Sequence, residues 1–264
     1  MSNTSLGTAI VTGASSGIGA VYADRLAHRG YDLVLVARNQ ARMEKLAQDI
    51  KQKTGRKVEI LVADLTQSAD INKVAQRVAS PDVTLLINNA GSAMATPLLA
   101  SDPAVAEDMI KLNVISLMHL SHAAAQAFVT RGGGTIINIS SVVAMAHELL
   151  NGSYSGTKAF VLNFSRSMHN ELHEKGLRVQ AVLPGATATE LWGNAGVSLS
   201  DLPPEWIMTT EDMVDAALVG LDAGEVVTIP ALPDAADWEA FDAARQKMLP
   251  NLSRKTPAAR YLKG

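Results

Sequence analysis

The chain has 264 residues, of which 47% are apolar and 19% charged, and this composition indicates a folded protein with a sizeable core. Lys and Arg (23) do not outnumber Asp and Glu (26), so the net charge of −3 gives no sign of a nucleic-acid or membrane partner. The absence of cysteine excludes disulfides, thiol nucleophiles and zinc sites with Cys ligands. The first apolar run, residues 9–11, is too short to export or anchor a chain, so we predict a cytoplasmic protein.

Seven short apolar runs, rich in β-branched residues, alternate with longer segments of helical period. The runs are residues 8–12, 32–37, 57–62, 84–88, 135–140, 178–183 and 226–229. Several, such as 33–36 and 85–87, are apolar throughout, which is typical of strands covered on both faces in a parallel sheet. Repeated βαβ units of this kind predict an α/β fold. We expect a Rossmann-type, doubly wound parallel sheet of about seven strands in a single domain, residues 1–264.

A glycine-rich turn joins the first predicted strand to the first predicted helix. It reads Thr12-Gly13-Ala14-Ser15-Ser16-Gly17-Ile18-Gly19. Gly13 allows a sharp turn, Gly17 lets backbone N–H groups approach a pyrophosphate, and Gly19 lets the helix pack close to the strand. The turn therefore predicts a dinucleotide site at the positive end of a helix dipole. The alternative is an ordinary glycine-rich turn between a strand and a helix.

Further motifs follow the glycine turn in chain order. They are Asn88-Asn89-Ala90-Gly91 at the end of the fourth strand, Ser140-Ser141 at the end of the fifth, Tyr154-Ser155-Gly156-Thr157-Lys158 at a helix start, and Pro184-Gly185 after the sixth strand. Together with the glycine turn they resemble the short-chain dehydrogenase/reductase family, in its compact branch of about 250 residues. This resemblance covers residues 8–189. It implies the strand order 3-2-1-4-5-6-7 and hydride transfer between a nicotinamide dinucleotide and a small-molecule carbonyl or alcohol substrate.

The catalytic residues that the resemblance implies are Asn113, Ser141, Tyr154 and Lys158. Tyr154 would be the acid/base, and Lys158, four residues later on the same helix face, would lower the pKa of the phenol and hold the nicotinamide ribose. Ser141, thirteen residues before Tyr154, would polarise the substrate oxygen, with Ser140 as the competing choice. Asn113 matches the family's helix asparagine, which holds a water that links the lysine to solvent.

The glycine turn and the resemblance together imply the cofactor-binding residues. They are Gly13, Ser15, Ser16, Gly17, Ile18, Gly19, Arg38, Asp64, Leu65, Asn89, Ala90, Gly91, Tyr154, Lys158, Pro184, Gly185, Thr187 and Thr189. Arg38 follows the second strand, where an acidic residue would favour NAD and a guanidinium accommodates a 2′-phosphate. We therefore predict that NADP(H) is preferred. NAD(H) stays open, because Ser16 stands where a subset of the family has a second cation, and Arg38 could be a solvated side chain.

The last part of the chain is expected to supply the substrate side. Residues 190–209 combine Gly, Pro and Trp in a pattern typical of a lid, with a packed surface loop as the alternative, and residues 250–264 predict an extended tail. The candidate substrate lining is Met94, Met145, Leu149, Leu150, Leu191, Trp192 and Trp206. This mostly apolar set favours a ketone, or a quinone-like or aryl carbonyl, over a sugar phosphate. His147 is a further candidate contact.

Other readings of the sequence are less consistent with its motifs. His169 and His173 resemble a zinc-protease helix, but no Glu directly follows the first His, so we predict no metal. A sugar epimerase or dehydratase would carry a GxxGxxG turn, which this chain lacks. A non-catalytic dinucleotide sensor of the same fold is the main alternative function, although a sensor has no need to keep Tyr154 and Lys158.

Two predicted helices carry more apolar surface than one buried face requires. The helix after Asn151 has Phe160, Val161, Leu162, Phe164, Met168 and Leu172, and the helix predicted over residues 104–130 has Ala123, Ala124, Ala125, Ala127 and Phe128. A helix that packs only on its own sheet needs an apolar stripe of about 100°. The surplus predicts a four-helix interface between copies, and the family resemblance also points to a homodimer or homotetramer.

Overall fold

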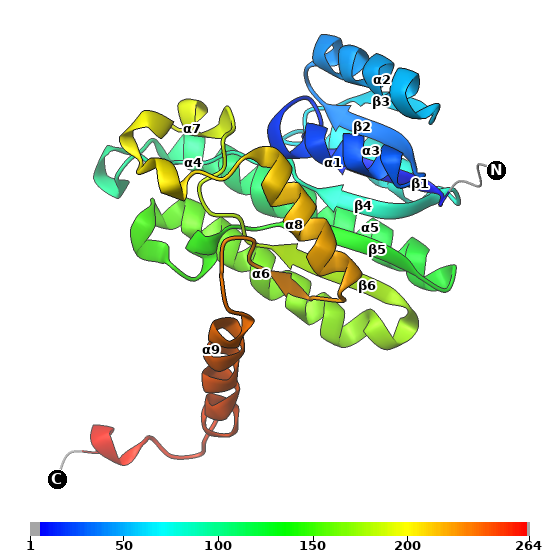
Figure 1. The fold of residues 1–264 in the computed structure, drawn as a ribbon. Helices are drawn as coiled ribbons and strands as arrows, with labels where there is room; N and C mark the ends of the chain where they lie inside the picture. The colour runs from blue at the N-terminus through cyan, green and yellow to red at the C-terminus, as the bar shows by residue number, and fades with distance from the viewer. Residues whose placement is uncertain (1–5, 263–264) are drawn as a thin grey trace. The chain divides into compact units, whose positions relative to one another are not determined.

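The structure, a computed structural model, describes residues 6–262. Within this range a parallel sheet of seven strands forms the centre of the fold (Figure 1). The strands are β1 (Thr8–Thr12), β2 (Asp32–Ala37), β3 (Val58–Val62), β4 (Val83–Asn88), β5 (Gly134–Ile139), β6 (Leu177–Val182) and β7 (Val227–Thr228). Their order is β3-β2-β1-β4-β5-β6-β7, which confirms the predicted topology. Every predicted strand agrees with the observed one to within one residue at each end.

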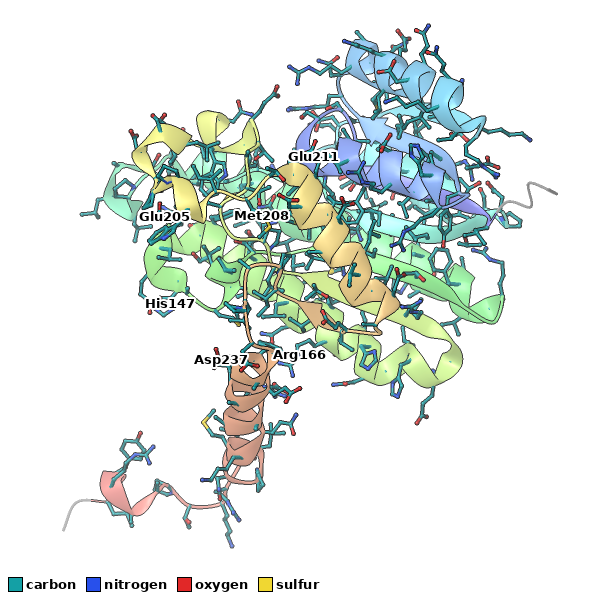
Figure 2. The ribbon with its side chains drawn as sticks, in the orientation of Figure 1. His147, Arg166, Glu205, Met208, Glu211 and Asp237 are labelled. Carbon is teal, nitrogen blue, oxygen red and sulfur yellow. The ribbon has the colours of Figure 1, made fainter. Side chains whose placement is uncertain are left out.

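Helices cover both faces of the sheet. They are α1 (Gly17–His28), α2 (Gln40–Thr54), α3 (Ser68–Val78), α4 (Pro103–Ile110), α5 (Leu117–Thr130), α6 (Gly152–Leu172), α7 (Leu191–Asn194) and α8 (Thr210–Asp222). Buried side chains of α1, α2 and α8 pack on one face, and those of α3, α5 and α6 pack on the other. Figure 2 shows Glu205 and Met208 on the segment that leads into α8, with Glu211 in the first turn of that helix.

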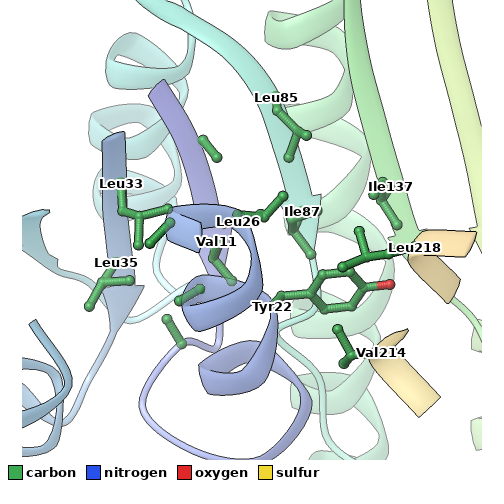
Figure 3. Close-up of a cluster of buried hydrophobic side chains, with 14 of the residues drawn as sticks. Val11, Tyr22, Leu26, Leu33, Leu35, Leu85, Ile87, Ile137, Val214 and Leu218 are labelled. Carbon is green, nitrogen blue, oxygen red and sulfur yellow. The ribbon is translucent and has the colours of Figure 1, made fainter. Parts of the chain in front are cut away.

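The sheet has one hydrophobic core on each face, and the side chains of its buried strands point alternately into one core and the other. Val11, Leu33 and Ile87 face the α1–α2–α8 side, where they surround Tyr22 and Leu26 (Figure 3). Their neighbours along the same strands belong to the opposite core; these are Ile10, Val34 and Leu86. Successive side chains of a strand point to opposite faces, so a strand buried on both faces must be apolar at every position. The continuous apolar runs of the sequence therefore predicted this sheet correctly.

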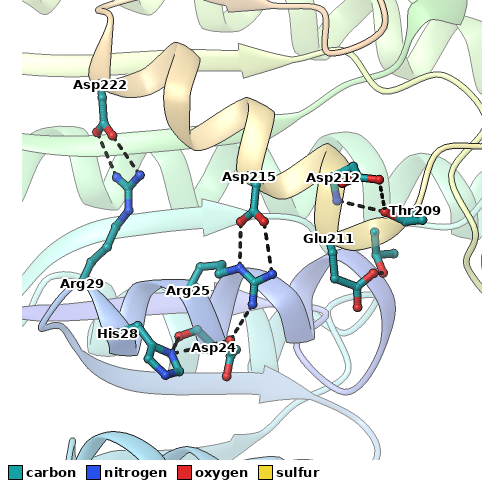
Figure 4. Close-up of polar contacts among 10 residues, drawn as sticks. Asp24, Arg25, His28, Arg29, Thr209, Glu211, Asp212, Asp215 and Asp222 are labelled. Atoms are coloured by element: carbon teal, nitrogen blue, oxygen red, sulfur yellow. Dashed lines mark hydrogen bonds and ion pairs between the residues drawn. The ribbon is translucent and has the colours of Figure 1, made fainter.

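Ion pairs fasten α8 along α1. Arg25 Nε lies 2.7 Å from Asp215 Oδ1, and Arg29 Nη2 lies 2.8 Å from Asp222 Oδ2 (Figure 4). The Arg25 guanidinium holds the pKa of Asp215 below its usual range. At the start of α8, Thr209 caps the helix by accepting a hydrogen bond from the backbone N–H of Asp212 at 3.0 Å. The N-terminal end of α8 is thus held in place at Thr209, directly after the segment of residues 190–208.

The predicted helix over residues 104–130 is not continuous. The α4 helix ends at Ile110, a π-helical turn follows over Lys111–Ser116, and α5 begins at Leu117. A π-turn inserts an extra residue into the helix and is common at functional sites. Here it contains Asn113, so the break in the helix coincides with a predicted site residue.

The described residues divide into two compact units, residues 6–230 and residues 231–262, and the single domain expected from the sequence stays a prediction. The second unit contains α9 (Ala235–Met248), which has no buried residue. Within the predicted extended tail, short 3₁₀ turns occur at Leu249–Asn251 and Ala259–Tyr261, while residues 263–264 lie outside the described residues. None of the helices among residues 6–262 has the length and apolar character needed to cross a membrane.

Candidate active site

A cavity of about 390 Å³ opens where the carboxyl ends of the strands meet. Of the predicted residues, it is lined by Gly13, Ser15, Ser16, Gly17, Ile18, Arg38, Asp64, Leu65, Asn89, Ala90, Gly91, Ser141, Tyr154, Lys158, Pro184, Gly185, Thr187 and Thr189. Gly19 and Asn113 do not line it. Open parallel sheets bind ligands at this edge, next to the point where the strand order reverses between β1 and β4. The structure therefore brings nearly all of the predicted residues together around one cavity.

The glycine turn has the backbone that the sequence predicts. Gly13 has φ +66° and Gly17 has φ +54°, a region that residues with a Cβ rarely adopt. A Cβ on Gly19 would lie 2.4 Å from the Gly13 carbonyl oxygen and 2.5 Å from Asn89 Nδ2. The missing Cβ of Gly19 therefore allows the turn and the Asn89 segment to pack together.

Thr12 ties this turn to the segment after β4. Its hydroxyl donates to the Ile87 carbonyl at 3.1 Å and accepts from the backbone N–H groups of Asn89 and Ala90, each at 3.0 Å. The Asn89 side chain donates to the Thr12 carbonyl at 2.9 Å. These bonds hold two walls of the cavity at a fixed separation. The sequence motif included Thr12 without assigning it a role, because its partners are more than 70 residues away.

Tyr154 and Ser141 meet on the side of the cavity formed by β5 and α6. Ser141 forms a hydrogen bond to Tyr154, which lowers the pKa of the phenol, but burial has the larger effect and raises this pKa to about 12. The sequence predicted a lowered pKa from the charge of Lys158. That prediction is wrong for this structure, where Lys158 Nζ lies 5.8 Å from the centroid of the Tyr154 ring and desolvation dominates. The Tyr154 phenol is consequently protonated at neutral pH.

Lys158 is buried beneath Tyr154. Its Nζ donates to the Ile139 carbonyl at 3.0 Å, and desolvation lowers its pKa to about 8. The Ser140 hydroxyl donates to the backbone carbonyl of Lys158 at 2.7 Å, so this serine is committed to fixing α6 against β5. Ser141 hydrogen-bonds to Tyr154, and its hydroxyl makes only a long bond of 3.3 Å to the Pro184 carbonyl, which favours Ser141 over Ser140 as the polarising group.

Asn113 is a link within the protein and does not form part of the cavity wall. Its Nδ2 donates to the Ser92 carbonyl at 2.8 Å and to Thr157 Oγ1 at 3.1 Å, while its Oδ1 accepts from the Ser92 N–H at 2.9 Å. Thr157 Oγ1 in turn donates to the Tyr154 carbonyl at 2.7 Å. Both N–H groups of the Asn113 amide are thereby engaged. The π-helical turn thus connects the segment after β4 to the first turn of α6.

The opposite end of the cavity carries charged side chains of both signs, namely Arg38 and Arg42 together with Asp64 and Glu190. Arg38 lines it without an ion pair or hydrogen bond to any of residues 6–262. Arg42 lines it too, and its Nη1 lies 2.7 Å from Glu190 Oε2. The Asp64 carboxylate accepts from the Thr66 N–H at 3.0 Å and from Thr66 Oγ1 at 2.8 Å, and these bonds hold its pKa below the usual range. The sequence analysis identified Arg38 and Asp64 but not Arg42 or Glu190.

The substrate side is only partly as predicted. Leu191 and Trp192 line the cavity, and Trp192 Nε1 donates to the Thr187 carbonyl at 2.9 Å. Met94 and Leu150 belong to an apolar cluster with Tyr154, as do Met109 and Val143, which the sequence did not suggest. Leu149 and Trp206 are exposed, at 57% and 60%, and Met145 packs against a different cluster. His147 lies at the surface, 3.4 Å from Glu148, and does not line the cavity (Figure 2).

In a comparison with models of protein families, the model of the family described as "short chain dehydrogenase" matches residues 7–198 of this chain. The chain belongs to the short-chain dehydrogenase family. Two solved structures resemble this dehydrogenase over nearly its whole length. The short-chain dehydrogenase from Sphingobium yanoikuyae, in complex with NADPH, is 46% identical with a TM-score of 0.94, covering 97% of this chain and 100% of that one. The bulky-bulky ketone specific alcohol dehydrogenase from Comamonas testosteroni is 41% identical with a TM-score of 0.91, covering 98% and 100%.

Curated relatives of the dehydrogenase are longer. The very-long-chain 3-oxoacyl-CoA reductase of Anas platyrhynchos is 32% identical over 97% of this chain and 82% of the relative. The matches to mammalian enzymes of the same name span only 60% of their length. The predicted family is thus confirmed, and the fold with it. The relatives named here give no support to the alternative of a non-catalytic sensor.

Residues that the sequence analysis missed in this dehydrogenase act through contacts between distant segments. Ser92 and Thr157 hold Asn113, and Arg42 pairs with Glu190 across 148 positions. One signal was available, because Arg42 lies only four residues after Arg38, in the segment that follows the second predicted strand. No group of three or more His, Asp or Glu side chains that could hold a metal ion occurs within residues 6–262.

Proposed function

We propose that this dehydrogenase interconverts a bulky, apolar ketone and the corresponding secondary alcohol in the cytoplasm, using NADP(H) as hydride donor and acceptor. The observation that carries the proposal is the meeting of Ser141, Tyr154 and Lys158 in the same cavity as the glycine turn and Arg38. The NADPH complex of the Sphingobium yanoikuyae enzyme supports the choice of cofactor. The simplest test of the proposed function is to measure consumption of NADPH by the purified protein over a panel of ketones.

The cavity fits a phosphorylated dinucleotide. The turn offers backbone N–H groups at the start of α1, and only the Thr189 side chain lies within 3.5 Å of a Cβ placed on Gly17, which leaves the cavity side open to a pyrophosphate. The unpaired guanidinium of Arg38 suits a 2′-phosphate at the far end. When bound, the nicotinamide supplies a hydride to a carbonyl carbon or accepts one from a carbinol carbon.

The chain's own residues would move the proton. In reduction, the protonated Tyr154 phenol donates its hydrogen to the carbonyl oxygen as negative charge develops there, while Ser141 donates a hydrogen bond to the same oxygen. The hydride forms the new C–H bond and the tyrosine supplies the O–H proton. Below pH 8 Lys158 would be an ammonium that can hold ribose hydroxyls. Asn113 keeps the start of α6 in position through Thr157.

The substrate class follows from the apolar surface around Tyr154. Met94, Val143 and Leu150 cluster with its ring, and Leu191 and Trp192 line the cavity on the other side. These side chains offer few polar partners, so a substrate with two apolar groups on the carbonyl would bind better than a sugar. The relative from Comamonas testosteroni, by its title, is specific for bulky-bulky ketones. We therefore expect diaryl or aryl-alkyl ketones to be reduced faster than small or polyhydroxylated ones.

Arg38→Asp is expected to reverse the cofactor preference. Removing the guanidinium takes away a charge-assisted contact to the 2′-phosphate, which should lower kcat/KM for NADPH by roughly 10- to 100-fold. NADH should lose less or gain, because the carboxylate can accept from ribose hydroxyls. Initial rates with both cofactors measure the effect. Lys45→Asp is the control, because it makes the same charge change on α2 away from the cavity. Its ratio of kcat/KM for NADPH to kcat/KM for NADH should match that of wild type. A wild-type preference for NADH would contradict the role assigned to Arg38.

Assembly into a dimer or tetramer through α5 and α6 is part of the proposal. Phe160 and Phe164 stack at 5.5 Å on α6 and stay partly exposed, and Ala123 and Ala127 offer small side chains on α5. Two copies could bury these faces against each other in a four-helix interface. Sedimentation at micromolar concentration should give about 56 or about 112 kDa. A single species at the 27.9 kDa of one chain would rule this interface out.

A further inference from the structure

An ion pair connects the cofactor side and the substrate side of the cavity. Arg42 Nη1 lies 2.7 Å from Glu190 Oε2, and both side chains line the cavity. Arg42 stands in the first turn of α2, directly after the strand end that carries Arg38. Glu190 directly precedes α7, the short helix of Leu191 and Trp192. The pair therefore joins the region next to Arg38 to the segment that bears the substrate-side residues.

Arg42 is a second cation in the cavity lining that contains Arg38. Arg38 and Arg42 are four residues apart and line the same end of the cavity. Asn39 caps α2 by accepting from the Arg42 N–H at 3.1 Å, which fixes the backbone from which the Arg42 side chain extends. A phosphate dianion carries more charge than a carboxylate and accepts bidentate hydrogen bonds from a guanidinium. An anion bound at Arg38 would consequently attract Arg42 more strongly than Glu190 does.

An exchange of partners by Arg42 is physically easy. Both members of the Arg42–Glu190 pair are largely exposed, with side-chain exposures of 49% and 60%, and exposed ion pairs stabilise folded proteins only weakly. Other contacts fix the rest of the segment. Trp192 is bonded to the Thr187 carbonyl, and Thr187 pairs with Met208 in a β-bridge. Loss of the ion pair would free Glu190 without unfolding the wall behind it.

We propose that Arg42 is shared between Glu190 and the 2′-phosphate of NADP(H), so that Glu190 competes with the phosphate and tunes cofactor choice. This inference rests on the proposed use of NADP(H). It assigns Arg42 as a specificity-determining residue and Glu190 as a residue that acts through it. NADP(H) releases the start of α7 from α2, whereas NAD(H), which has no 2′-phosphate, leaves the pair intact. The substrate-side segment therefore differs in mobility with the two cofactors.

The test compares two adenosine probes that differ only in the 2′-phosphate. Adenosine 2′,5′-bisphosphate and adenosine 5′-monophosphate are titrated by calorimetry into the full chain, which reports binding without catalysis. Arg42→Gln should weaken the bisphosphate by about 10-fold or more and leave the monophosphate within about twofold. Glu190→Gln should strengthen the bisphosphate by about threefold, the size expected for an exposed competing charge. Lys45→Gln and Glu205→Gln are charge-matched controls outside the cavity and should change neither affinity.

The double variant Arg42→Gln/Glu190→Gln distinguishes competition of Glu190 with the phosphate for Arg42 from a general effect of the Glu190 charge on phosphate binding. If Glu190 acts through Arg42, Glu190→Gln should have no effect in the Arg42→Gln background. An equal strengthening in both backgrounds would show that Glu190 acts only as a nearby negative charge, and the proposal would fail. It would also fail if Arg42→Gln left bisphosphate binding unchanged while Arg38→Gln weakened it, an outcome that preserves the NADP(H) function. Equal affinity of wild type for both probes would instead contradict the proposed cofactor itself.

Discussion

Tyr154→Phe is expected to lower kcat for ketone reduction by about 100-fold or more, because it removes the proton donor. The Tyr154 ring is buried among Met94, Met109 and Val143, and phenylalanine keeps that packing. The variant should therefore fold normally and bind NADPH about as tightly as wild type. Turnover with a diaryl ketone, NADPH affinity and the melting temperature together separate a lost proton from a damaged fold.

Tyr22→Phe is a matched control for this experiment. Tyr22 is fully buried between α1 and the sheet, and its hydroxyl has no hydrogen-bond partner within residues 6–262 (Figure 3). Removing that hydroxyl leaves no group unsatisfied, so stability should stay equal or rise. Turnover should match wild type, since Tyr22 lies outside the cavity. Unchanged turnover in Tyr154→Phe would mean that the proton comes from another group.

Lys158→Met is expected to abolish turnover and yet stabilise the fold at neutral pH. Burial lowers the pKa of Lys158 from 10.5 to about 8, which means that the folded protein pays about 3 kcal/mol to keep the ammonium charged at pH 7. Methionine fills similar volume without that cost, although the Ile139 carbonyl loses its donor. The net gain should raise Tm by several degrees, at about 2–4 °C per kcal/mol for a protein of this size.

The pH dependence of this gain has a definite sign. Below pH 8 lysine is charged in both the folded and the unfolded chain, so the full cost is present and the advantage of Lys158→Met is largest. Between pH 8 and 10.5 the unfolded chain binds more protons than the folded one, and wild-type stability rises with pH relative to the variant. Thermal unfolding at pH 7 and pH 10 should show the gap in Tm closing. If the difference in Tm between Lys158→Met and wild type were the same at both pH values, or if Lys158→Met were less stable than wild type at pH 7, Lys158 would not be both charged and desolvated in the folded protein.

The sheet could be predicted from the sequence because burial on both faces leaves a local signature. Strand β2 is apolar at every position after Asp32, β4 is apolar over Leu85, Leu86 and Ile87, and the glycine turn marks the end of β1. The roles of Tyr154, Lys158 and Ser141 were predicted from the resemblance to the short-chain dehydrogenase/reductase family, whose motifs are short stretches of sequence. These features depend on residues that are close together in the chain.

The remaining features depend on distant contacts. The pKa of Tyr154 is raised because the folded chain desolvates the phenol, which spacing to Lys158 alone could not show. The pairing of Arg42 with Glu190 joins α2 to the start of α7. The role of Asn113 required the π-helical turn, which has no local sequence signature here. Likewise, nothing in the apolar content of residues 235–248 revealed that α9 has no buried residue.

The most direct test of the account is to follow the hydride and the proton together. Purified protein is incubated with NADPH deuterated on the transferable position of the nicotinamide and with a diaryl ketone, and the alcohol is analysed by mass spectrometry. We expect one deuterium on the carbinol carbon for wild type and, at equal enzyme concentration, at least about 100-fold slower formation of the alcohol with Tyr154→Phe. Tight binding of NADPH without deuterium transfer to any ketone of the panel would contradict it and would favour a non-catalytic dinucleotide sensor.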